Sequence, residues 1–164
     1  MDRLFHNTQT DEIPATKGTY LLCLRLDVSK TIQVGKLEKL DFDRGYYCYV
    51  GSAFGSGGLR ARIKRHLRFN KKMHWHIDFL KSCATVEKII YSLNVNPQEC
   101  IWSRLLQTSS SLAPAVNKFG ASDCRCATHL FYSIERNNCS LLHALLIKTF
   151  PGDDINLLEM PRNM

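Results

Sequence analysis

The sequence lacks several features that would place it in a broad class at once. It has no apolar run near the roughly 20 residues that a transmembrane helix needs. Its first residues, MDRLFHNTQTDEIP, contain no apolar core of a secretory signal. It also has no internal repeat and no low-complexity segment. These absences argue against membrane, secreted and repeat proteins, so we expect a cytoplasmic globular chain.

Acidic residues are missing from one long segment. Between Arg44 and His76 the chain has eight Lys or Arg residues and no Asp or Glu. The rest of the chain carries 14 basic against 15 acidic residues, so the net charge of +7 comes from this segment. A solvated helix face would explain such a run. A one-sided cluster beside glycines and tyrosines favours an anionic partner instead, with nucleic acid first.

Cysteines, by contrast, are numerous. There are seven, at positions 23, 48, 83, 100, 124, 126 and 139. Without a signal peptide we expect reduced thiols rather than a disulfide framework.

Cys124, Cys126 and His129 fall within six residues, and zinc prefers four such ligands. Buried thiols and a core histidine would explain the pattern; the alternatives are a structural zinc site, with Cys100 or Cys139 as the fourth ligand, and a redox pair.

The stretch YYCYVGSAFGSGGLRARIKRHLR, from Tyr46 to Arg68, is typical of a strand, a glycine-rich loop and a basic helix. Leu59, Ile63 and Leu67 recur at i, i+4 and i+8, which predicts one buried stripe. Arg62 and His66 lie one turn apart at the border of that stripe and should be held near the protein body. The residues expected to bind nucleic-acid phosphates are Arg60, Arg65, Arg68, Lys72 and His74.

His74, Trp75 and His76 form a second dense cluster with Asp78. His74 and Asp78 are spaced i, i+4 on a predicted helix, which allows a hydrogen bond or a shared metal. We expect His74 at the rim of the active site, in contact with a substrate phosphate, and Trp75 in the core.

The periodicities along the chain predict an α/β-type domain with helices flanking a small sheet. Strands are expected at residues 18–26, 31–35, 46–50, 85–93 and 129–134, with 31–35 returning as a hairpin partner of 18–26. Helices are expected at 59–68, 74–81, after Pro97 and at 141–150. Residues 1–16 are predicted to be a flexible leader, 17–150 a single domain and 151–164 a fraying tail.

Two tripeptides on neighbouring predicted strands, Gly18-Thr19-Tyr20 and Tyr49-Val50-Gly51, resemble the motifs of the GIY-YIG nuclease superfamily. The strings YVGSAFGSGGL, HWHIDFL and FGASDCRCATHLFY look like its small stand-alone Uri-type endonucleases. The resemblance covers residues 17–135. It implies an α+β fold with a small, mostly antiparallel central sheet flanked by helices. It also implies metal-dependent hydrolysis of phosphodiester bonds, in DNA rather than RNA. Thr19 replaces the middle Ile of the first motif, where we expect only packing.

The resemblance also implies a role for each site residue. Tyr20 and Tyr49 would assist water activation, Arg62 would bind the scissile phosphate, and His66 would support them with a proton or phosphate contact. Glu99 would hold Mg²⁺ or Mn²⁺, which prefer carboxylate oxygens. A tyrosine acts as a base or relay only if nearby cations lower its pKa from about 10. The alternative is a module of the same fold that binds nucleic acid without cutting it. The oligomeric state is not predicted.

Overall fold

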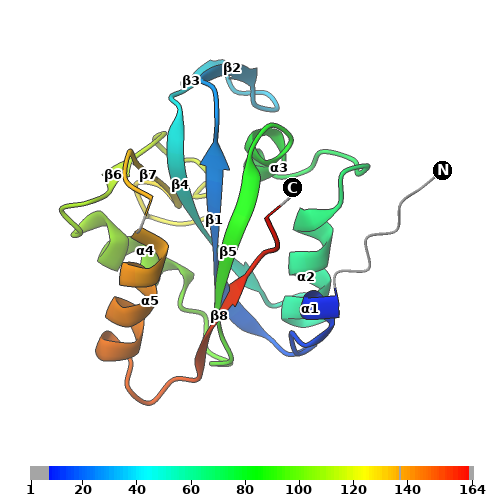
Figure 1. The fold of residues 1–164 in the computed structure, drawn as a ribbon, viewed down its shortest axis with the longest axis vertical. Helices are drawn as coiled ribbons and strands as arrows, with labels where there is room; N and C mark the ends of the chain where they lie inside the picture. Colours follow the sequence, from blue (N-terminus) through cyan, green and yellow to red (C-terminus); the bar gives the residue numbers. More distant parts are fainter. Residues whose placement is uncertain (1–7, 137, 163–164) are drawn as a thin grey trace.

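A six-stranded antiparallel sheet in the order β6-β7-β4-β1-β5-β8 forms the centre of the molecule (Figure 1). The computed structural model describes residues 8–136 and 138–162. The central strands are β1 Gly18–Leu26, β4 Gly45–Ala53, β5 Thr85–Ser92, β6 Ala113–Pro114, β7 Leu130–Ser133 and β8 Ile155–Glu159. A separate two-stranded sheet contains β2 Lys30–Gln33 and β3 Lys39–Phe42.

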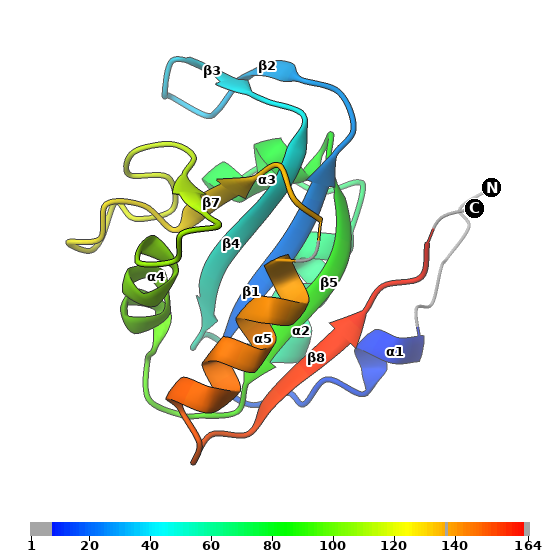
Figure 2. The same cartoon turned by 60° about the vertical axis from the view of Figure 1, so that its left-hand side comes forward.

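Helices cover both faces of the central sheet. They are α1 Thr8–Asp11, α2 Gly58–Leu67, α3 His76–Lys81, α4 Glu99–Gln107 and α5 Asn138–Thr149. Figures 1 and 2 show α2 and α3 on one face and α4 and α5 on the other. The alternation along β1 explains the two cores: Leu22 packs with α2 and α3, whereas Leu21 packs with α4 and α5. The predicted fold class is confirmed.

The register of β1 against β4 brings the two tyrosine motifs side by side. Tyr20 pairs with Gly51 and Leu22 pairs with Tyr49. A Cβ atom built on Gly51 would lie 2.4 Å from the Tyr20 ring. The glycine of the second motif is therefore required because the tyrosine of the first motif packs directly on its backbone.

The second strand does not pair as the sequence suggested. β2 forms a hairpin with β3, from the pair Lys30–Phe42 to the pair Gln33–Lys39, and makes no ladder with β1. Both flanks of β1 are occupied, by β4 and by β5. The short β2–β3 hairpin therefore lies at one end of the central sheet (Figure 1).

For the described residues, the predictions of a flexible leader at 1–16 and a fraying tail at 151–164 are both wrong. Ile13 is 1% exposed, and the backbone N–H of Leu59 at the start of α2 donates to Thr16 O over 2.8 Å. Residues 8–16 therefore pack onto α2, whereas residues 1–7 of the predicted leader lie outside the described part. Near the other end, β8 adds to β5 from Ile155–Ser92 to Glu159–Lys88 and closes one edge of the sheet.

The prediction of reduced thiols rather than a disulfide framework is wrong for two of the seven cysteines. Cys23 of β1 and Cys139 of α5 form a disulfide across a sequence separation of 116 residues. Spacing along the chain gave no sign of this pairing, because only the packing of α5 onto the sheet brings the two residues together. No helix in the described ranges is long and apolar enough to cross a bilayer.

Candidate active site

One cavity of about 260 Å³ gathers four of the five predicted catalytic residues. Tyr20 enters it from β1, Tyr49 from β4, Arg62 from α2 and Glu99 from the first turn of α4. The other lining residues are Gly51, Ser52, Trp75, Gly120, Asp123, Cys124 and His129. Residues that are far apart in the sequence thus share one polar cavity, at the end of the sheet where both tyrosine motifs lie.

The fifth predicted residue, His66, supports the cavity from behind. Its Nε2 atom lies 2.7 Å from the hydroxyl of Tyr20, and the histidine side chain is 1% exposed. Burial and the nearby charge of Lys71 lower the pKa of His66 to about 3. The imidazole is therefore neutral at physiological pH, and its Nε2 atom can accept a hydrogen bond from the Tyr20 hydroxyl.

Both tyrosines of the cavity are protonated phenols. Burial, and then the neighbouring Tyr49, raise the pKa of Tyr20 well above its usual value, although Arg62 acts in the opposite direction. Burial and Glu99 raise the pKa of Tyr49 in the same way. The Tyr49 ring also packs against Gly120, where a Cβ atom would lie 2.8 Å from it. The charge of Arg62 is therefore too weak to lower the pKa of either tyrosine below its usual value.

Arg62 is held over an aromatic surface. Its guanidinium carbon lies 4.3 Å from the centre of the Trp75 ring, and the guanidinium carbon of Arg65 lies 4.0 Å from the same centre. Cation–π contact restricts a long side chain while leaving its N–H groups free to bind an anion. Trp75 is half-buried, packs against the core and also lines the cavity, so the prediction of a core tryptophan is right only in part.

Arg65 binds a buried carboxylate within the protein. Its two terminal nitrogens lie 3.1 and 3.0 Å from the two Asp78 carboxylate oxygens, and Lys71 Nζ lies 3.0 Å from one of them. Asp78 is 0% exposed. Burial alone would raise its pKa, but Arg65, Lys71 and two backbone N–H groups outweigh burial and lower the pKa well below its usual range. Arg65 is therefore a structural arginine, and Asp78 is unavailable as a metal ligand.

The other predicted phosphate-binding residues differ from one another. Arg60 donates from Nε to the carbonyl of Ile13 over 2.7 Å and holds the N-terminal segment on α2. Arg68, Lys72 and His74 are exposed. His74 precedes α3 rather than lying on it; its backbone N–H donates to Asp78 over 2.9 Å, and its ring packs on Trp75. It does not line the cavity.

Glu99 is held in the cavity by two contacts of its carboxylate and one backbone contact of the residue before it. Its Oε2 accepts a hydrogen bond from the Ser52 hydroxyl over 3.0 Å, and its Oε1 lies 2.9 Å from Nδ1 of His129. The preceding residue, Gln98, donates its backbone N–H to the buried Thr19 hydroxyl over 3.2 Å. Thr19 therefore has a polar role, and the expectation that it only packs is wrong.

The three predicted zinc ligands do come together, and Cys100 joins them. The ligand atoms of Cys100, Cys124, Cys126 and His129 all lie within 4.8 Å of one another. Cys139 is excluded as a fourth ligand because it forms the disulfide with Cys23. Burial and the neighbouring thiols raise the pKa of Cys126 to about 12. Burial opposes ionisation of His129, but Glu99 and Cys124 together raise its pKa.

A family model described as a domain of unknown function, DUF123, matches residues 19–150. The chain belongs to the DUF123 family. The match includes all the residues that line the candidate active site and the Cys/His cluster. It ends before β8, the strand that closes one edge of the sheet. A comparison with curated proteins and a comparison with solved structures each found no match.

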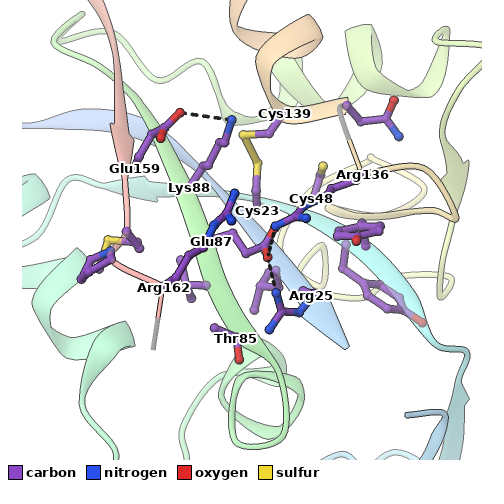
Figure 3. Close-up of a pocket in the computed structure, with 17 residues that line it drawn as sticks. Cys23, Arg25, Cys48, Thr85, Glu87, Lys88, Arg136, Cys139, Glu159 and Arg162 are labelled. Carbon is purple, nitrogen blue, oxygen red and sulfur yellow. Dashed lines mark hydrogen bonds and ion pairs between the residues drawn. A yellow bond between two sulfur atoms is a disulfide. The ribbon is translucent and has the colours of Figure 1, made fainter. Parts of the chain in front are cut away.

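The DUF123 domain has a second, larger cavity of about 440 Å³, lined by other positions of β1 and β4, 23–25 and 46–48. Figure 3 shows that its charged groups mostly face each other: Arg25 lies 2.6 Å from Glu87, and Lys88 lies 3.3 Å from Glu159. The Cys23–Cys139 disulfide forms part of its wall. None of the predicted catalytic residues lines this cavity, so the smaller one is kept as the candidate site.

Sequence reasoning missed Ser52 and did not foresee the roles of Asp78 and Trp75 in the DUF123 site. Ser52 directly follows the second tyrosine motif, and alternation along β4 would have turned it away from Gly51 and toward the side of α4. Asp78 is the first carboxylate after the long basic segment, which is a signal for ion pairing. Trp75 gave no such signal, because its contacts with Arg62 depend on how α3 packs beside α2.

Proposed function

We propose that this DUF123 protein is a metal-dependent endonuclease that hydrolyses phosphodiester bonds in DNA. The observation that carries the proposal is the meeting of Tyr20, Tyr49, Arg62 and Glu99 in one cavity, from four separate elements. This set combines an anion-binding arginine, a carboxylate and two hydroxyl groups, as hydrolysis of a phosphodiester requires. The resemblance of the two tyrosine motifs to GIY-YIG nucleases and the expected cytoplasmic location are part of the same proposal.

Glu99 fits the role of ligand to Mg²⁺ or Mn²⁺. Its side chain is 25% exposed and faces a cavity, and Asp123 lines the same cavity. Divalent magnesium is usually held by one or two carboxylates, together with waters and substrate phosphate oxygens. When bound, the metal would polarise a phosphoryl oxygen and acidify a water. Ser52 and His129 hold the carboxylate in place from behind.

Arg62 would bind the scissile phosphate. Its planar guanidinium matches phosphate oxygens, and its contact with Trp75 limits the conformational entropy lost on binding. Arg68 and Lys72 on the adjacent exposed surface would bind flanking phosphates through charge alone. Arg60 and Arg65 are left out of this binding surface because their guanidinium groups already bind protein oxygens.

The two tyrosines would act as hydrogen-bond donors and acceptors. Both are protonated because burial raises their pKa values, so neither begins as a phenolate base. Tyr49 would donate a hydrogen bond to a phosphate oxygen. Tyr20, whose hydroxyl donates to Nε2 of the neutral His66, would accept a hydrogen bond from the attacking water and orient it. The water would lose a proton to solvent as its oxygen bonds to phosphorus, and the leaving ester oxygen would take a proton from solvent as its bond to phosphorus breaks.

Incubation with nucleic acid tests the proposal. The purified chain is mixed with plasmid DNA, branched and single-stranded DNA oligonucleotides and matched RNA, with Mg²⁺, Mn²⁺ or EDTA. We expect cleavage of DNA that needs the metal and leaves 5′-phosphate and 3′-hydroxyl ends. Binding across the panel without cleavage would instead identify a non-catalytic nucleic-acid-binding module of the same fold.

A further inference from the structure

Three thiols and one imidazole form a closed set beside the candidate active site. Cys100 lies on α4, and Cys124, Cys126 and His129 lie on the segment that leads into β7. Their ligand atoms are all within 4.8 Å of one another. Two segments that are distant in the sequence thus supply four metal-binding groups to one point, whereas Cys48 and Cys83 lie elsewhere as single thiols.

We propose that these four residues bind a structural zinc ion. Zinc takes four ligands in a tetrahedron, and a zinc–sulfur bond of about 2.3 Å places the sulfur atoms of a site about 3.8 Å apart. The observed spacing needs only a small contraction to reach that geometry. Four protein ligands leave no open position, so this ion would hold the fold together rather than activate a water. The proposal stands apart from the nuclease function and from the Mg²⁺ or Mn²⁺ ion assigned to Glu99.

The charge balance around the cluster supports a bound zinc. Three thiolates and one zinc ion carry a net charge of −1, which needs a nearby cation in a partly buried place. Lys118 supplies it: its Nζ donates to the carbonyls of Cys124 and Cys126 over 3.1 and 3.0 Å. The backbone N–H of Lys118 also donates to the carbonyl of Ala127. The loop is therefore tied into one conformation by a lysine inside it.

His129 connects this cluster to the candidate active site. Its Nε2 atom lies 3.4 Å from the sulfur of Cys124, and its Nδ1 atom lies 2.9 Å from Oε1 of Glu99. A metal-bound histidine commonly gives its other N–H to a carboxylate, which fixes the ring and strengthens the metal bond. Glu99 thus acts as a positioning residue for the zinc site, and the zinc in turn orients Glu99 in the cavity.

The first test is the metal content of the whole chain purified without added metal. We expect one zinc per chain, released when a mercurial reagent blocks the thiols, and a lower melting temperature in the presence of a strong chelator. Replacement by Co²⁺ should give the absorption bands of a tetrahedral thiolate site. Zinc far below one per chain, iron in its place, or a melting temperature indifferent to the chelator would each overturn the proposal.

Variants separate the zinc ligands from other cysteines. Cys124→Ser should lose the zinc, whereas Cys83→Ser, at a half-buried thiol outside the cluster, should keep it in full. If Cys124→Ser does not fold, the Co²⁺ spectrum of the unmodified chain still decides the question. Loss of zinc from both variants alike would contradict the assignment of the ligands.

The link through His129 has its own test. Glu99→Ala removes the carboxylate beside Nδ1 and should lower zinc affinity by about 10- to 100-fold, as measured against a competing chelator. Glu99→Gln keeps an acceptor oxygen and should lose less. This readout needs no nuclease activity. Equal zinc affinity in Glu99→Ala and the unmodified chain would show that Glu99 does not position the histidine.

Discussion

The hydroxyl of Tyr20 lies 2.7 Å from Nε2 of a histidine, His66, that is almost completely buried. The pair joins β1 to the last turn of α2, so the basic helix is linked to the strand that carries the first tyrosine motif. The neutral imidazole is a hydrogen-bond acceptor that substrate and solvent do not reach directly. Its ring also packs beside Trp75, but among the described lining residues Tyr20 alone hydrogen-bonds to it.

Buried His66 makes the stability of the protein depend on pH in a predictable direction. Its pKa is about 3 in the folded chain and 6.5 as an ordinary value. Below pH 6.5 the unfolded chain therefore binds a proton that the folded chain does not bind. The free energy of unfolding should fall by about 1.4 kcal/mol per pH unit as the pH drops from 6.5 toward 3.

Urea unfolding at several pH values, followed by circular dichroism, measures this dependence. His66→Gln keeps a polar group beside Tyr20 and removes the titration. We expect its stability to change less steeply than that of the unmodified chain across this window. Parallel pH dependences would show that His66 is not buried as a neutral base.

Arg62→Ala and Glu99→Gln should remove cleavage without unfolding the protein. Arg62 lines the cavity and packs on Trp75, and Glu99 is partly exposed, so neither side chain supports the core. Loss of one charged group at a transition state costs about 100-fold or more in rate. Single-turnover cleavage rates measure the loss, and Glu99→Gln should still bind DNA.

Exposed residues away from the cavity provide matched controls for these two variants. Arg104→Ala changes an arginine on α4, and Glu38→Gln changes an acid between β2 and β3. Both should cleave at nearly the normal rate. If Glu99→Gln also does so, Asp123 becomes the remaining carboxylate of the cavity to test.

Arg65 and Lys72 should separate stability from binding. Arg65→Ala leaves the buried Asp78 carboxylate without its two-point partner and should lower the free energy of unfolding by about 2–3 kcal/mol. Lys72→Ala should leave stability unchanged, weaken DNA binding and reduce the salt dependence of binding by about one ion. Thermal melting and binding isotherms at several salt concentrations measure the two effects. The reverse pattern would return Arg65 to the phosphate-binding surface.

Thr19→Val should loosen α4 while filling the same volume. The Thr19 hydroxyl is buried and accepts the backbone N–H of Gln98, the residue before Glu99. Loss of this acceptor leaves a buried N–H unpaired and should destabilise the fold by about 1–2 kcal/mol. Thr19→Ser keeps the hydroxyl and should recover most of the stability. A Thr19→Val variant as stable as the unmodified chain would mean that the Thr19 side chain contributes only packing.

Much of the candidate site could be predicted because its signals are local. The tyrosine motifs mark β1 and β4, the spacing of Arg62 and His66 fixes their place on α2, and Glu99 opens the helix after Pro97. The pairing of Arg65 with Asp78 could not be predicted, because it depends on how α3 packs beside α2. Local charge suggested a phosphate-binding arginine, but tertiary contact with a buried carboxylate decided its role.

Contacts between residues far apart in the sequence account for the other features that could not be predicted. Cys100 joins Cys124 because α4 packs against β4, the strand that pairs with β7. Cys139 is held away from them, in the disulfide with Cys23, by the packing of α5. The five residues of β8 carry no strong strand pattern of their own. They extend only because β5 offers an unpaired edge, which is a property of the assembled sheet.

The Cys23–Cys139 disulfide makes the middle of the chain a covalent ring. Of the catalytic residues proposed above, Tyr20 alone lies outside it, and the glycine-rich turn around Gly55 and Gly57 is exposed within it. A protease that cuts that turn would leave two pieces still joined and still packed on one sheet. A nicked molecule should therefore run as one chain on a non-reducing gel and as two after reduction, and it could keep its active site through the cut.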